Sequence, residues 1–273
     1  MDLSRKTKIV CTIGPATEKG DVLRSLMQQG MDVARLNFSH GDNKHHAEIF
    51  DMIRTISEDL EKETAILCDI QGPKIRTGTM AYPVNLNAGD IVRVTPDPVL
   101  GTEKLFTIDH PDLLQDLDID DEIFLNDGIV KLRVTGREKD ALVCEVRSGG
   151  LVSDRKGCNI PSAELSIRIP TENDLVDLKV IADLDPEYVA VSFVAKPEDV
   201  ENVKNSLKEF GNDSIKLIAK IERPIALRNL QEIIEVSDGI MVARGDLGVE
   251  IPPHEVPIWQ KEIMQVNYPN LKL

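Results

Sequence analysis

Polar and charged residues gather where the apolar runs of this sequence end. At the ends of four apolar runs stand, in order, Arg35, Asn37 and Ser39; Asp69; Lys220 and Glu222; and Arg244 and Asp246. In a strand, residues two apart lie on the same face, so the pairs at 35 and 37, 220 and 222, and 244 and 246 should each point in one direction. We therefore expect the four ends to share one charged pocket.

Each of these residues also has a purely structural interpretation. Arg35 could pair with a carboxylate at the rim of the fold. Lys220 and Glu222 could form an internal ion pair, and Asp246 could cap a turn or a helix. Because the same pattern recurs at four run ends, chance is a poor explanation of all of them, and the shared pocket is the preferred interpretation.

The elements that would position this pocket alternate between strands and helices. Apolar runs at 8–14, 31–39 and 64–70 alternate with helix-period segments near 20–29 and 43–61. The alternation resumes later in the segments 171–183, 187–193, 197–210, 216–222, 224–235 and 239–246. Strands that alternate with helices and are apolar on both faces favour a parallel sheet covered by helices. Its active site should lie at the carboxyl ends of the strands.

A different pattern interrupts this alternation. Between residues 76 and 168 the sequence has short alternating strands separated by turn signals such as NAGD, TPDP and NDG. This pattern predicts a small β-domain inserted into the α/β unit. We therefore expect three segments: the first part of the barrel at 1–75, the insertion at 76–168, and the second part of the barrel at 169–273.

Composition narrows the classes of function. The chain has 273 residues and a formal net charge of −15, which argues against general binding to nucleic acid or to anionic membranes. No apolar run approaches the ~20 residues of a membrane-spanning helix, and the basic start lacks the pattern of a signal peptide. The four cysteines show no spacing suited to zinc. We expect a cytoplasmic protein.

Five motifs, in order along the chain, resemble the pyruvate kinase family. They are VARLNFSHG (33–41), DIQGPKIRTG (69–78), RKGCNIP (155–161), AKIE (219–222) and MVARGDLGVEIP (241–252). The resemblance implies an α/β protein, an incomplete (β/α)8 TIM barrel with an inserted small β-barrel lid domain. It also implies the glycolytic transfer of a phosphoryl group from phosphoenolpyruvate to ADP, which gives pyruvate and ATP. Family members are usually homotetramers.

The family's catalytic roles map onto five residues of this chain. By resemblance, Arg35 and Lys220 hold the phosphoryl group, and Lys220 also stabilises the enolate that remains after transfer. Glu222 and Asp246 are implied to bind magnesium, for which hard oxygen ligands are suited. Backbone N–H groups near Gly245 are implied to receive the carboxylate of the substrate.

The family's nucleotide contacts map onto four other residues. These are Asn37 and His40 after the second strand, Arg76 at the entrance to the insertion, and Lys156 on the lid. Lys156, taken without the resemblance, could equally be a solvated surface lysine. His45 and His46 are both expected to be exposed on the following helix.

One departure from the family concerns a monovalent cation. Many members hold potassium with side chains at the positions of Asn37, Ser39, Asp69 and a threonine, and they carry a glutamate nearby. Here the threonine position is Ile70 and the glutamate position is Lys74. Ile70 still offers a carbonyl oxygen, and the Lys74 ammonium could take the place of the cation. We predict that potassium is unnecessary.

The resemblance stops before the family pattern is complete. In the family pattern, the chain continues with two further barrel strands, a threonine that assists proton transfer, and a C-terminal regulatory domain. Here NYPNLKL at 267–273 does not resemble that continuation. Six of eight strands would leave unpaired edges, so we expect impaired turnover from this chain.

Two other functions remain open from the sequence. One is a non-catalytic fragment that still binds phosphoenolpyruvate and magnesium. The other is a magnesium-dependent TIM-barrel lyase or aldolase that acts on pyruvate-like acids, which would also place Lys, Glu and Asp at strand ends. The inserted β-domain with Lys156, and Arg76 placed for a nucleotide, argue against the lyase.

Overall fold

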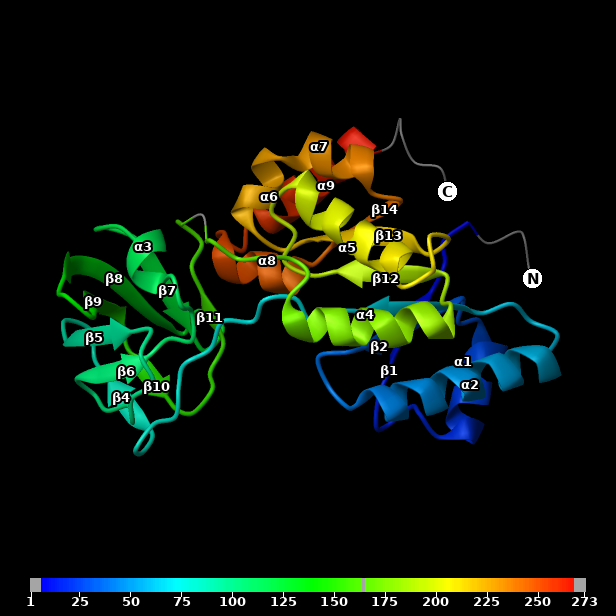
Figure 1. Cartoon of the computed structure of the whole chain (residues 1–273), viewed down its shortest axis with the longest axis horizontal. Helices are drawn as coiled ribbons and strands as arrows, with labels where there is room; N and C mark the ends of the chain where they lie inside the picture. Colours follow the sequence, from blue (N-terminus) through cyan, green and yellow to red (C-terminus); the bar gives the residue numbers. More distant parts are fainter. Residues whose placement is uncertain (1–5, 164, 268–273) are drawn as a thin grey trace.

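A six-stranded parallel sheet forms the centre of the larger part of the molecule (Figure 1). The structure is a computed structural model that describes residues 6–163 and 165–267. In spatial order the strands are β1 (Val10–Ile13), β2 (Val33–Asn37), β3 (Ala65–Asp69), β12 (Tyr188–Val191), β13 (Lys216–Ile221) and β14 (Gly239–Val242). All five neighbouring pairs are parallel, so every carboxyl end lies at the same edge.

Helices cover the outside of the curled sheet (Figure 1). They are α1 (Gly20–Gln29), α2 (Asn43–Asp59), α4 (Glu172–Leu184), α5 (Pro197–Glu209), α6 (Pro224–Arg228), α7 (Leu230–Val236) and α9 (Val256–Asn267). The short helix α8 (Arg244–Glu250) lies instead at the carboxyl end of β14, on the side of the inserted segment (Figure 1). Their buried residues recur three or four positions apart, as in Leu23 and Met27 of α1, and pack against the strands. This packing explains why β3 and β12 are largely buried.

The sheet curls but does not close. β1 and β14 pair on one side only, and Val10 of β1 is 51% exposed. The described residues therefore form an incomplete TIM-like barrel, as expected. No helix among residues 6–163 and 165–267 is long and apolar enough to cross a membrane. The unusual segment NYPNLKL lies, apart from its first residue, outside the described residues.

The inserted segment forms the smaller lobe at the left of Figure 1. Its elements are β4 (Val84–Leu86), β5 (Ile91–Thr95), β6 (Leu105–Thr107), α3 (Leu113–Asp116), β7 (Glu122–Leu125), β8 (Val130–Arg137), β9 (Leu142–Ser148), β10 (Gly150–Val152) and β11 (Cys158–Asn159). A mainly antiparallel six-stranded sheet and a two-stranded sheet enclose a core of their own. The inserted lobe and the barrel thus have separate cores, and the boundaries near 76 and 168 stay a prediction.

Local signals explain where α4 and α1 begin or end. The Thr171 hydroxyl accepts from the N–H of Asp174, and the Asp174 carboxylate accepts from the N–H of Thr171, which forms a capping box. Gly30 ends α1 at φ 114°, a left-handed conformation that glycine adopts without a steric penalty.

The expected strand at 239–246 is too long. β14 ends at Val242, and Arg244 and Asp246 belong to α8. The argument that residues two apart face one direction is therefore wrong for this pair, because successive residues of a helix are about 100° apart. Asp246 instead occupies the first turn of α8, next to the carboxyl end of β14.

Candidate functional site

Asp69 joins the two cations that the sequence singled out. Its carboxylate lies at the end of β3, is 1% exposed, and accepts from Arg35 Nε at 2.7 Å. The other oxygen lies 3.2 Å from Lys220 Nζ. Since β2, β3 and β13 end at the same edge of the sheet, the parallel register brings these residues together. Arg35 also donates to the hydroxyl of Thr12 on β1.

Lys220 is buried among acceptors. Its ammonium lies 2.8 Å from Glu222 Oε1 and donates to the Ser192 hydroxyl at 2.8 Å. Burial alone would lower the pKa of Lys220, but the charges of Glu222 and Asp69 outweigh it and raise that pKa. Lys220 is therefore a positively charged group at neutral pH. The internal ion pair considered from the sequence is present and forms part of the charged cluster.

Glu222 is the second buried member of the cluster. Its Oε2 accepts from the backbone N–H of Phe193 at 2.7 Å. Burial raises the pKa of this carboxyl group and the nearby charge of Asp246 adds to the rise, while Lys220 and the Phe193 N–H oppose it. Glu222 and Asp246 are thus close enough for their charges to interact.

The donor set fits a magnesium ion only in part. Glu222 and Asp246 supply carboxylate oxygens, and Mg²⁺ usually binds through one or two carboxylates with substrate oxygens and waters. Among the described residues no group of three or more His, Cys, Asp or Glu side chains could hold a metal. The residues present thus suit a metal that arrives with an anionic substrate.

The end of β2 carries the positions expected for a monovalent cation. Asn37 Oδ1 accepts from the N–H of Ser39 at 3.1 Å, which turns the chain after the strand. The Ile70 carbonyl accepts from the Ser192 hydroxyl at 2.7 Å. Lys74 interacts electrostatically with Asp246 and Lys220. Within the described residues, no hydrogen bond joins Lys74 to either of them. Burial, followed by the charge of Arg76, lowers the pKa of Lys74.

Arg76 and Lys156 lie on adjacent segments at the base of the lid. Arg76 pairs with Gly157 in a β-bridge, and the N–H of Thr77 donates to the Lys156 carbonyl at 2.8 Å. Arg76 also donates to the Arg155 carbonyl at 3.0 Å. The backbone at the entrance to the inserted domain and the backbone just before β11 therefore lie side by side.

The predicted exposure of His46 is wrong. His46 is 8% exposed, its ring stacks on Phe38 with centroids 4.2 Å apart, and its Nε2 lies 2.8 Å from the carbonyl of His40. Burial lowers the pKa of His46. This histidine fixes the loop that carries His40, while the side chain of His40 itself is exposed.

Sequence reasoning missed the end of β12. Ser192 and Phe193 both contact the cluster, yet no role was expected for this strand end. The available signal is a polar residue after the apolar run 188–191, but it is weak because a serine, unlike a charged residue, is common at any strand end.

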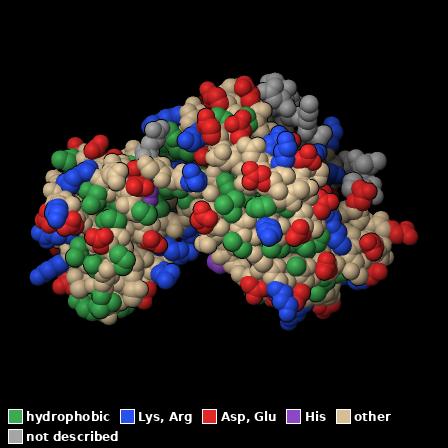
Figure 2. All heavy atoms as spheres, viewed as in Figure 1, with side chains coloured by type: hydrophobic (Ala, Val, Ile, Leu, Met, Phe, Trp, Pro, Cys, Tyr) green, Lys and Arg blue, Asp and Glu red, His purple; other side chains and the backbone are tan. Residues whose placement is uncertain are grey.

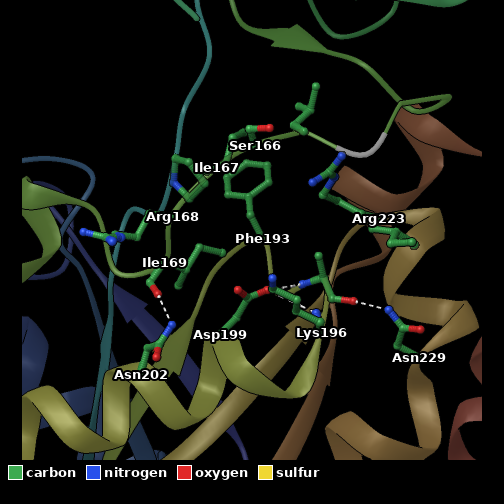
Figure 3. A pocket seen from close by; sticks show the side chains of 14 residues that line it. Ser166, Ile167, Arg168, Ile169, Phe193, Lys196, Asp199, Asn202, Arg223 and Asn229 are labelled. Atoms are coloured by element: carbon green, nitrogen blue, oxygen red, sulfur yellow. Dashed lines mark hydrogen bonds between the residues drawn. The ribbon is translucent and has the colours of Figure 1, made fainter. Parts of the chain in front are cut away.

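Two cavities are lined in part by Phe193, the residue whose N–H contacts Glu222. One of about 120 Å³ is lined by Lys74, Asp246 and Phe193. Another of about 530 Å³ lies beyond Phe193, against the return linker 165–169 and Arg223 (Figure 3). Lys and Arg side chains border the hollow between the two lobes, whereas both charge signs mix over the visible barrel surface (Figure 2).

Fold and site together define a class: a (β/α) barrel protein with a lid inserted after its third strand and with a cluster of charged side chains at its strand ends. The family model for "Pyruvate kinase, barrel domain" matches residues 4–270. The chain therefore belongs to the pyruvate kinase family.

Curated relatives agree with this assignment. The chain is 42% identical over 264 residues to a pyruvate kinase of Staphylococcus haemolyticus, covering 96% of this chain and 45% of the relative. It is 43% identical over 264 residues to one of Bacillus licheniformis, with the same coverage. A pyruvate kinase of Mycobacterium tuberculosis is 41% identical over 271 residues, covering 99% of this chain and 57% of the relative. The chain thus spans about half the length of these relatives.

Proposed function

We propose that this chain carries the phosphoenolpyruvate and magnesium site of a pyruvate kinase, which transfers a phosphoryl group to ADP and releases pyruvate. The cluster of Arg35, Asp69, Lys220 and Glu222 is the observation that carries the proposal. It joins two cations and two carboxylates at adjacent carboxyl ends of a parallel sheet, where barrel enzymes bind substrates.

The cations suit the charge that the reaction moves. The Arg35 side chain is 25% exposed, so its guanidinium can reach a phosphoryl group while Asp69 fixes its orientation. Lys220 is held protonated by its acidic neighbours and is placed to stabilise the enolate left after transfer. Magnesium held by Glu222 and Asp246 would neutralise charge on the transferred group.

The remaining assignments follow from the family. Gly245 would present its N–H to the substrate carboxylate, and an added side chain there would meet no atom within 4 Å, which leaves room for a ligand. Asn37, His40, Arg76 and Lys156 would contact the nucleotide. The pairing of the Arg76 and Lys156 segments at the base of the lid supports this assignment for those two residues.

Formation of pyruvate from phosphoenolpyruvate and ADP with magnesium tests the proposal. The Lys220→Met variant serves as the blank, because it removes the charge and keeps a similar volume. Turnover that Lys220→Met abolishes would support the full reaction in this chain. A folded chain that binds phosphoenolpyruvate without turnover would be the non-catalytic alternative, and a folded chain that does neither would contradict the proposal.

A further inference from the structure

The end of β12 contacts both the lysine and the metal-binding carboxylate of the cluster. Ser192 follows the last residue of the strand and is 3% exposed, and Phe193 comes next. Ser192 contacts Lys220 through its hydroxyl group, and Phe193 contacts Glu222 through its backbone N–H. Two neighbouring residues thus contact two groups that must keep a fixed geometry for catalysis.

The Ser192 hydroxyl has a defined direction. Its one proton goes to the Ile70 carbonyl at 2.7 Å, the shorter of its two acceptor contacts, because Asp69 Oδ1 lies at 3.3 Å. A lone pair is then free to accept from Lys220 Nζ at 2.8 Å. A hydroxyl that donates on one side and accepts on the other fixes the lysine relative to the loop after β3.

The backbone of Phe193 has a left-handed conformation, with φ 59°. Such a value is uncommon for a residue with a side chain and persists only where surrounding contacts hold it. In this conformation the N–H of Phe193 donates to Glu222 Oε2 at 2.7 Å. Phe193 lines both of the cavities described above, and Figure 3 shows its ring at the larger of the two.

Gly72 packs against this turn and leaves no space for a side chain. A Cβ atom at Gly72 would lie 3.0 Å from both the Cβ and the carbonyl oxygen of Ser192, and 3.1 Å from the Phe193 ring. Its N–H donates to Asp174 at the start of α4. Gly72 therefore supports the turn from the opposite side.

We propose that Ser192 and Phe193 are positioning residues, the Ser192 hydroxyl fixing the ammonium of Lys220 and the Phe193 N–H fixing the carboxylate of Glu222. The importance of this placement for catalysis rests on the proposed function. The placement itself can be tested without any substrate or metal.

The test measures how fast acetic anhydride acetylates Lys220 at fixed pH, read by mass spectrometry of the digested chain. Ser192→Ala removes one acceptor of the ammonium, and we expect Lys220 to react about five-fold faster. Ser206→Ala is the matched control, because it also deletes a hydroxyl with one carbonyl acceptor, on the outer helix α5. We expect that control to leave the rate at Lys220 unchanged.

Two substitutions at Phe193 separate the backbone from the ring. Phe193→Gly keeps the left-handed turn and its N–H at no steric cost, whereas β-branched Phe193→Val disfavours it. We expect faster acetylation of Lys220 in Phe193→Val, because Glu222 without its donor is no longer held against the Lys220 ammonium, and a rate near that of the native chain in Phe193→Gly. Phe193→Ala, with a smaller steric penalty, replaces the valine variant if that variant does not fold.

Three outcomes decide the inference. Equal rates in Ser192→Ala and Ser206→Ala would overturn the role of Ser192, and equal rates in Phe193→Gly and Phe193→Val would overturn the role of the Phe193 backbone. Mn²⁺ binding, followed by electron paramagnetic resonance, should be about ten-fold weaker in Phe193→Val than in Phe193→Gly. A native chain that binds no Mn²⁺ would count against the proposed metal site, while the acetylation rates would still decide the positioning roles.

Discussion

Asp69 shows how one buried carboxylate organises the whole site. It lies between Arg35 and Lys220, and both cations need it because a buried charge without a partner is costly. By the family resemblance, Asp69 is also one of the positions expected to hold a monovalent cation. We predict that Lys74, at a position where the resemblance implies a glutamate, makes this cation unnecessary.

Lys74→Glu should create a dependence on potassium. In the native chain we expect the affinity for phosphoenolpyruvate to be nearly the same with potassium or with a tetramethylammonium salt, because Lys74 supplies the positive charge. In Lys74→Glu we expect binding to weaken about ten-fold or more without potassium and to recover when it is added. Calorimetric titration measures both, and a native chain that gains affinity many-fold on adding potassium would contradict the role of Lys74.

Most of the cluster could be predicted from the sequence, and the exceptions have physical causes. Lys220 and Glu222 stand out because charged residues rarely end a buried strand without a function. Ser192 does not stand out, since a serine is common at any strand end and its role depends on a contact with Lys220, 28 positions away. The left-handed conformation of Phe193 has no signal in its residue type, and the burial of His46 depends on stacking against Phe38.

Among the elements, the return linker from the lid is tied to α3. Asp116 of α3 accepts from the N–H and the hydroxyl of Ser166 at 2.6 and 2.7 Å, and from His110 Nε2 at 2.6 Å. Burial would raise the pKa of Asp116, but the hydrogen bonds from Ser166 and His110 outweigh it and lower that pKa. This carboxylate therefore fixes the path of the chain between lid and barrel.

Asp116→Asn should destabilise the fold in a pH-dependent way. An acid with a lowered pKa contributes stability above its unfolded value of about 3.9, and that contribution is lost as the pH falls through the folded value. We expect Asp116→Asn to lower the free energy of unfolding by about 1–3 kcal/mol at pH 7, and the difference to shrink below about pH 4. Urea denaturation measures it, with exposed Asp140→Asn as control. A difference that does not change with pH would contradict this account.

Element types were largely predictable, and element boundaries less so. The capping box of Thr171 and Asp174 uses only local contacts, so the sequence predicts the start of α4 correctly. The end of β14 was misplaced because the apolar run continues to Ala243 while the helix begins at Arg244. Hydrophobic pattern alone does not distinguish a strand that continues from a turn that starts a helix.

At the scale of the whole molecule, the open sheet is the dominant feature. The outer strands β1 and β14 each have one unpaired edge within the described residues, and both are only partly buried. Exposed strand edges with apolar side chains are templates for pairing with another chain. We therefore expect association that increases with concentration.

Val10→Lys should reduce this association. Val10 lies on the edge strand β1 and is 51% exposed, and a lysine there disfavours pairing with a second edge. The matched control is Val176→Lys, at a site 62% exposed on the surface of α4. Sedimentation velocity should show a smaller associated fraction for Val10→Lys only. An equal effect of both substitutions would indicate general solubility in place of edge pairing.

The central claim, a phosphoenolpyruvate site that depends on a divalent metal, is tested most directly by calorimetric titration of phosphoenolpyruvate into the chain with magnesium and with a chelator. We predict binding with magnesium that weakens at least about ten-fold in the chelator, and equally in Glu222→Gln, because the carboxylates and the substrate share the ion. Binding that is unaffected by the chelator and by Glu222→Gln, or no binding by a folded chain, would contradict the account.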